Sequence, residues 1–353
     1  MKVPWRLALL ACGFASLVAG VAAGLARLGF AIELPPGPAV ALHGPLLGGA
    51  FFGTVIGIER AIALGRAWVW TAPVACASAG LAWILGAGTA PGALLLAGGG
   101  LVLLAASLDL WRRHPELPNA CLALGAACLP AGGAVLAGGD PQAATPAWLG
   151  FLALTIAGER LELSRFMPRS PAASLAFAAI AAALFGACML AAFAPSLGWK
   201  PLAAAMLALA AWLFTNDIAR RTVRESGLPR YIAWALLAGY AWLAAGALVA
   251  LGAVEFLPGR PAYDAALHAW FLGFVFSMVF GHAPIIAPAV LRAALAYHPL
   301  FYAPLALLHA TLALRVAGDL AGAAALRESG AAGNAAAIGL FIATMAARAL
   351  ARR

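Results

Sequence analysis

Four of the six histidines lie within long apolar stretches of the sequence: His43, His268, His282 and His309. A neutral imidazole can ligate haem iron or copper without burying a charge, and helix bundles hold these metals through histidines on facing helices. We expect His43, His268 and His309 to lie at compatible depths, so that two of them ligate one b-type haem and the third ligates copper or bonds to a haem propionate. The alternative is that each histidine only hydrogen-bonds a neighbouring helix.

His282 follows His268 by 14 residues on the same predicted helix, a separation of about 21 Å at 1.5 Å per residue. The two histidines therefore cannot share a metal. Pro284 and Pro288 follow His282 and predict a helix that ends early and lines a cavity, in which His282 would belong to a second site. A buried, hydrogen-bonded histidine is the alternative.

Charged residues stand at the ends of several of the same apolar stretches. The pairs Glu59-Arg60 and Glu159-Arg160 stand at the ends of two stretches on one predicted side of a membrane. Carboxylates near a membrane face can relay protons, so these pairs predict a proton-entry path, with ion pairs that anchor helix ends as the alternative. Arg315, six residues after His309, can pair with a haem propionate or can be an arginine that reaches the membrane interface.

The elements that position these residues must be membrane-spanning helices. Of the 353 residues, 64% are hydrophobic and 10% are charged, against soluble averages of roughly 45–50% and about 25%. This composition excludes a soluble enzyme and a secreted disulfide scaffold, and it makes the lipid bilayer the first partner of the chain. The net charge of +9 does not indicate nucleic-acid binding, because the basic residues stand singly between apolar runs, as topology-setting residues do. The five cysteines form no CxxC motif and predict neither an Fe–S nor a zinc site.

Runs of about twenty apolar residues, the length that crosses a bilayer core, predict an all-α bundle of twelve transmembrane helices. The whole chain, 1–353, is expected to form one integral membrane domain. The predicted spans are 6–28, 40–62, 68–88, 91–110, 118–138, 145–164, 172–194, 199–218, 230–252, 263–283, 299–317 and 331–350.

Basic residues predict the orientation of these spans, and short repeated motifs predict how the spans are grouped. Of the 22 Lys and Arg residues, 17 fall on one side, which predicts that both termini are cytoplasmic. The motif His-x3-Leu-Gly begins at His43 in the second span and at His268 in the tenth, and Glu59-Arg60 in the second span matches Glu159-Arg160 in the sixth. These matches predict three four-helix repeat units.

The tenth span resembles a signature helix of a known family. It carries His268-Ala269, then Gly273, Ser277-Met278 and Gly281, and is similar to the pattern His-Ala-x3-Gly-x3-Thr-Met-x2-Gly of the NnrS family. These are twelve-helix bacterial membrane proteins that contain haem and copper and are linked to tolerance of nitric oxide. The run 307–316, which holds His309 and Arg315, is similar to the family's Leu-Arg-Val helix.

The resemblance implies a haem b protein of the bacterial inner membrane. Copper has less support, because the second span carries only His43 followed by Gly44, where the family has His-x-His-Glu. In this interpretation the protein binds or processes a small gas such as nitric oxide, or passes electrons to a redox partner. His43 and His268 are the expected iron ligands, His309 a third ligand or distal group, and Arg315 a propionate partner.

Two other functions stay open at this point. One is a proton-coupled secondary transporter without a cofactor, in which the histidines and the Glu-Arg pairs form the substrate path. The other is a membrane accessory protein that turns nothing over. The sequence decides neither whether the chain is an enzyme nor which oligomer it forms.

The predicted topology is testable with reporter fusions. Fusions after Pro141 and after Gly259 should place alkaline phosphatase outside the cytoplasm and make it active. Fusions after Arg113 and after Arg224 should keep the phosphatase inactive and a fluorescent protein bright. Two contrary results would contradict the assigned topology and, with it, the predicted depths of the histidines.

Overall fold

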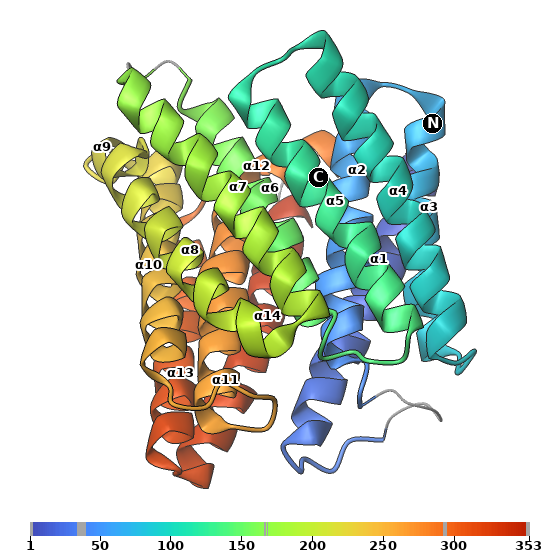
Figure 1. The fold of residues 1–353 in the computed structure, drawn as a ribbon, viewed down its shortest axis with the longest axis vertical. Helices are drawn as coiled ribbons and strands as arrows, with labels where there is room; N and C mark the ends of the chain where they lie inside the picture. The colour runs from blue at the N-terminus through green and yellow to red at the C-terminus, as the bar shows by residue number, and fades with distance from the viewer. Residues whose placement is uncertain (1–2, 34–39, 166, 168, 292–294, 351–353) are drawn as a thin grey trace. The chain divides into compact units, whose positions relative to one another are not determined.

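A computed structural model describes residues 3–33, 40–165, 167, 169–291 and 295–350 (Figure 1). All regular elements in this described part are helices, and no strand occurs in it. The predicted all-α fold is therefore confirmed.

The chain divides into two compact units, Met1–Glu162 with Ala181–Gly198, and Leu163–Ile180 with Trp199–Arg353. The single membrane domain predicted from the sequence covers both units. The first unit contains the following elements: α1 (Val3–Arg27), the π-helical segment η1 (Pro45–Phe51), α2 (Phe52–Leu64), the 3-10 turn η2 (Ala67–Trp70), α3 (Thr71–Ile84), α4 (Thr89–Arg113), α5 (Leu117–Ala137) and α6 (Thr145–Leu163). Within it, α3 packs against α1 and α2, and α4 packs against α3 and α5.

Two helices contribute residues to both units: α7 (Pro171–Phe193) and α8 (Pro195–Asn216). The remaining elements of the second unit are α9 (Ala219–Thr222), α10 (Gly227–Gly252), α11 (Pro261–His268), the π-helical segment η3 (Ala269–Phe276), α12 (Ser277–Leu291), the 3-10 turn η4 (Pro299–Phe301), α13 (Tyr302–Ala321) and α14 (Ala324–Leu350). Within this unit α10 packs against η3 and α12, and α13 lies along α14.

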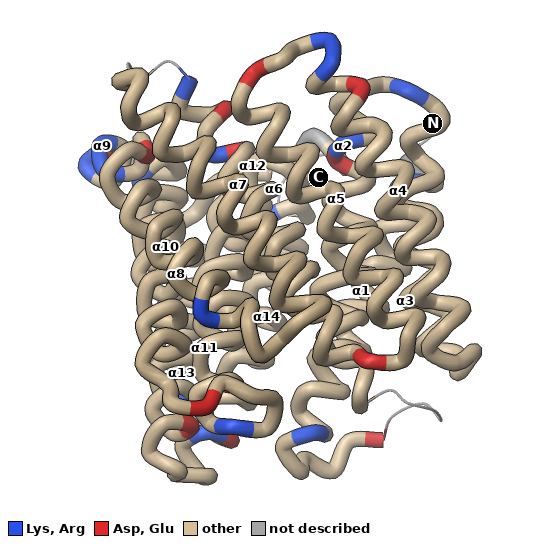
Figure 2. The backbone as a smooth tube through the Cα atoms, viewed as in Figure 1, with Lys and Arg blue, Asp and Glu red and all other residues tan. Residues whose placement is uncertain are grey.

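Eleven helical stretches of the described residues are long and apolar enough to cross a membrane. They correspond to eleven of the twelve predicted spans. The twelfth, predicted at 145–164, is helix α6, whose final turns carry Glu159, Arg160 and Glu162 and whose other residues are mostly buried. By the length and composition of its helices the chain is a multi-pass membrane protein, and Figure 2 shows the charged residues concentrated toward the helix ends.

Two span boundaries differ clearly from the prediction. The last helix begins at Ala324 rather than at 331, because its first turns are good helix formers that include charged residues and so escape a search for apolar runs. The tenth span continues beyond 283, and α12 runs through Pro284 and Pro288 to Leu291. The prediction that the helix ends early at these prolines, beside His282, is wrong.

A buried tyrosine explains why α12 continues through Pro284. Proline has no N–H, so the carbonyl of Phe280, one turn earlier, receives no bond from Pro284. The hydroxyl of Tyr231 on α10 donates to this carbonyl at 3.0 Å, and Tyr231 is fully buried. The side chain thus supplies the hydrogen bond that the helix lacks.

The end of α10 is completed by a side chain in the same way. Lys200 lies on α8, and its ammonium points at the carbonyls at the end of α10. Carbonyls at a helix end have no partner within the helix. The Nζ of Lys200 donates to the carbonyls of Ala250, Leu251 and Ala253 at 3.0, 2.7 and 2.7 Å. Lys200 therefore caps α10 and attaches α8 to it.

The role of Tyr231 predicts a non-additive pair of variants. Tyr231→Phe leaves the buried carbonyl of Phe280 without a donor and should lower the stability of the purified protein by about 1–3 kcal/mol. Pro284→Ala restores a backbone N–H to the helix, so Tyr231→Phe should cost clearly less in that background. Thermal denaturation of the four proteins in detergent measures both effects, and equal losses in the two backgrounds would contradict this explanation.

Candidate functional site: two histidines beside π-helical segments

His43 and His268 occupy equivalent places in two irregular helices. The π-helical segment η1 begins two residues after His43, and η3 begins directly after His268. Both segments end eight residues after their histidine, at Phe51 and Phe276. Single π-helical turns are rare and occur frequently at functional sites.

These segments support a repeat between the second and tenth spans. The shared motif His-x3-Leu-Gly lies at the start of each π-helical segment. Helix α6, which was predicted to be the third copy, is α-helical from Thr145 to Leu163. The π-helical feature is therefore common to two of the three predicted repeat units.

The ring of His43 lies against the backbone of α1. Its Nδ1 is 2.7 Å from the carbonyl oxygen of Gly20, and because a carbonyl only accepts, Nδ1 is the donor. Gly24, one turn later, makes room for the ring: a Cβ on this residue would lie 2.6 Å from Cε1 of His43. In a neutral imidazole this arrangement assigns the lone pair to Nε2.

His268 has the same tautomer and a charged neighbour. Its Nδ1 donates to the carbonyl of Asp264 at 2.7 Å, and the carboxylate of Asp264 lies 3.7 Å from the same nitrogen. That carboxylate also pairs with Arg315 on α13, at 3.3 Å between Oδ2 and Nη2. Arg315 is 8% exposed, and its buried Nε has no hydrogen-bond partner among the described residues.

Asp264 was missed in the sequence, although its position four residues before His268 was a usable signal. Residues at this spacing share one helix face, and metal-binding histidines commonly have a carboxylate or carbonyl on the second ring nitrogen. Through Asp264 the structure brings together two predicted site residues, His268 and Arg315.

Both ring nitrogens of His309 have side-chain partners. The indole Nε1 of Trp242 donates to Nδ1 at 3.0 Å, so the ring carries its proton on Nε2. That Nε2 lies 3.3 Å from Oγ of Ser277, whose own hydroxyl donates to the carbonyl of Ala235 at 2.6 Å. The imidazole thus joins α10, α12 and α13, and a metal ligated by His309 would have to displace one of these bonds. Nothing in the sequence connected Trp242 or Ser277 to it.

The remaining histidines have local partners. Nδ1 of His282 bonds to the carbonyl of Met278 at 2.7 Å, within α12. His114 follows the end of α4, and the ring of His298 accepts from the N–H of Leu300 at the start of η4. His114 and His298 thus lie in connections between helices.

One of the predicted carboxylate groups forms an ion pair between helices. Arg60 on α2 lies 3.6 Å from Glu159 on α6, and both belong to the first unit. Glu59 interacts electrostatically with Glu159 and with Arg60, and Arg160 is buried. An ion pair that attaches one helix end to another was the alternative to a proton path, and this geometry agrees with it. The proton path stays a prediction.

A family model described as a domain of unknown function (DUF8744) matches residues 6–350. The chain belongs to the DUF8744 family. No curated protein and no solved structure matches it.

The predicted site residues of this DUF8744 protein belong to two different units of the chain. His43 and its described partners lie in the first unit, whereas His268, Asp264, Arg315 and His309 lie in the second. Among the residues that the structure describes, no group of three or more His, Cys, Asp and Glu side chains is placed to hold a metal ion. Ligation of one iron by His43 and His268 together stays a prediction.

The packing of His43 on α1 gives a direct test. Gly24→Ala places a methyl group where the His43 ring lies, so the ring should move and lose its bond to Gly20. Gly98→Ala on α4 is the matched control, because a Cβ on Gly98 meets nothing within 4 Å. Replacing glycine in a helix normally stabilises by roughly 0.5–1 kcal/mol. We therefore expect Gly98→Ala to raise or keep the melting temperature and Gly24→Ala to lower it, and equal effects would contradict the placement of the ring.

Proposed function

We propose that this DUF8744 protein is a haem protein of the bacterial inner membrane that binds or processes a small gas such as nitric oxide, or passes electrons. One observation carries the proposal. His43 and His268, each just before a π-helical segment, both donate Nδ1–H to a backbone carbonyl at 2.7 Å.

This arrangement fits a ligand of haem iron. A histidine that ligates a metal through one ring nitrogen commonly donates the other N–H to a carbonyl or carboxylate, which fixes the tautomer and increases the basicity of the ligating nitrogen. For His43 and His268 the ligating atom would be Nε2. A porphyrin supplies four nitrogens of its own, so iron needs only one or two imidazoles from the protein.

The surroundings of His268 support the proposal further. The buried Nε of Arg315, which has no partner among the described residues, is a donor that a haem propionate can satisfy. Asp264 holds Arg315 and the ring of His268 in place together. When bound, the haem would supply the iron at which a gas is coordinated or an electron is carried. The chain would supply the imidazoles, their orientation and the charge near the propionates.

The proposal does not make His309 an iron ligand, and it does not include copper. We assign His309 to the packing of α10, α12 and α13 rather than to iron, because Trp242 and Ser277 occupy both of its nitrogens. Copper remains a prediction that rests on the resemblance alone.

A proton-coupled transporter is the second candidate, and one observation favours it. The π-helical segments make two helices irregular in corresponding sequence contexts, and secondary transporters often place substrate sites at interrupted helices of internal repeats. The Arg60–Glu159 pair would then belong to the proton path. Such a protein would be colourless when purified.

The haem proposal is tested by spectra of histidine variants. Wild-type protein purified in detergent should show a Soret band and α and β bands that change on reduction. His43→Ala and His268→Ala should each lose most of this haem or shift its bands, because each removes a coordinate bond. His282→Ala is the matched control, since its ring also donates Nδ1–H to a carbonyl but does not precede a π-helical segment.

Haem content per chain, size-exclusion profiles and membrane yield of the variants complete the test. A control that loses haem like the other two would contradict the assignment of His43 and His268. A colourless but well-folded wild type would contradict the haem proposal itself and favour the transporter.

A further inference from the structure

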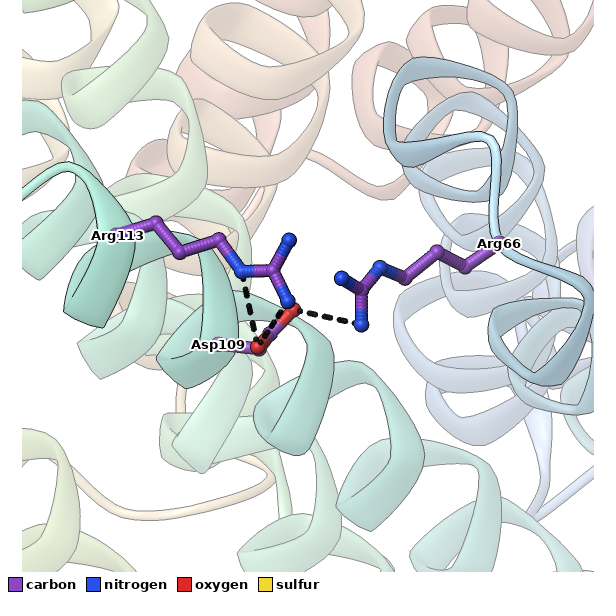
Figure 3. Close-up of polar contacts among 3 residues, drawn as sticks. All are labelled: Arg66, Asp109 and Arg113. Carbon is purple, nitrogen blue, oxygen red and sulfur yellow. Dashed lines mark hydrogen bonds and ion pairs between the residues drawn. The ribbon is translucent and has the colours of Figure 1, made fainter.

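Two arginines of the first unit share one carboxylate (Figure 3). Arg66, between α2 and η2, lies 3.4 Å from Asp109 on α4. Arg113, at the end of the same helix, lies 3.0 Å from the other oxygen of Asp109. Because one carboxylate faces two guanidinium groups, the cluster keeps a net positive charge.

Further basic residues extend this cluster. Arg112 precedes Arg113 and is exposed, and among the described residues it has no ion-pair partner. Arg6 on α1 lies over the ring of Trp70 at 5.5 Å, which joins the start of α1 to η2, directly after Arg66. Four arginines thus stand against Asp109 and the exposed Glu116 of the next connection.

Three tryptophans accompany the arginines. Trp5, Trp68 and Trp111 are 44%, 41% and 40% exposed, and each is next to or two residues away from one of these arginines in the sequence. Tryptophan is enriched at membrane–water interfaces, where its ring sits at the level of the lipid headgroups. We call the set of Arg6, Arg66, Arg112, Arg113, Trp5, Trp68 and Trp111 the Arg–Trp surface.

We propose that the Arg–Trp surface binds the headgroup phosphate of an anionic phospholipid. A guanidinium matches a phosphate with two parallel hydrogen bonds, and the net positive charge complements the lipid. The surface lies at the ends of helices that can cross a membrane, and exposed tryptophans suit a lipid headgroup better than a free anion. Its arginines belong to the predicted cytoplasmic side, where anionic lipids attract basic residues. The proposal is independent of haem.

The test is native mass spectrometry of the full-length protein in detergent, titrated with phosphatidylglycerol or with phosphatidylcholine of the same acyl chains. We expect the wild type to bind phosphatidylglycerol more tightly. Arg112→Gln/Arg113→Gln should weaken that binding by about tenfold, since each arginine near an anionic surface contributes roughly fivefold and Arg113 shares its charge with Asp109. Arg221→Gln/Arg224→Gln removes two exposed arginines from the second unit and should leave the affinity within about twofold.

Three outcomes would overturn the proposal. The first is equal binding of the two lipids by the wild type, and the second is an equal loss of affinity in the two double variants. The third is displacement of phosphatidylglycerol by millimolar inorganic phosphate, which would make the surface a site for a free anion. Thermal denaturation of both double variants shows that a loss of lipid binding does not come from unfolding, because exposed ion pairs such as Arg113–Asp109 contribute little to stability.

Discussion

Each polar group inside the hydrocarbon core of a membrane must find its hydrogen-bond partner within the protein, because no water is present there to provide one. Helices meet this requirement for most of their backbone, and side chains meet it where a helix is interrupted or ends. Tyr231 bonds the buried carbonyl opposite Pro284, and at the exposed end of α10 Lys200 bonds the carbonyls of Ala250, Leu251 and Ala253. These contacts hold α10 to α12 and to α8 within the second unit.

The same requirement orients the histidine rings. In His309 both ring nitrogens are used by Trp242 and Ser277, so the imidazole fastens three helices together. In His43 and His268 the Nδ1–H is committed to a backbone carbonyl, which directs the chemistry of the ring to Nε2. The helix backbone thus fixes the tautomer of both neutral rings. This bonding of Nδ1, together with the adjacent π-helical segments, is why the proposed iron ligands are His43 and His268.

The sequence predicted the features that depend on local composition. Apolar runs located the spans, and the motif His-x3-Leu-Gly predicted a repeat but not the π-helical segments that follow it in both helices. The contact of Trp242 with His309 joins residues 67 positions apart and depends on how α10 and α13 are rotated about their axes, which no single run of residues determines. Pro284 was read as a helix end because its missing partner, Tyr231, lies 49 positions away. Asp264 was within reach, since it stands one helical turn before His268.

The central claim is that the helices with His43 and His268 carry haem iron. The most direct measurement is the iron content of the wild-type protein, purified in detergent after expression with a haem precursor, by elemental analysis. The account predicts iron in stoichiometric amount relative to the chain and extractable as haem. A monodisperse, folded protein that contains no iron would contradict it.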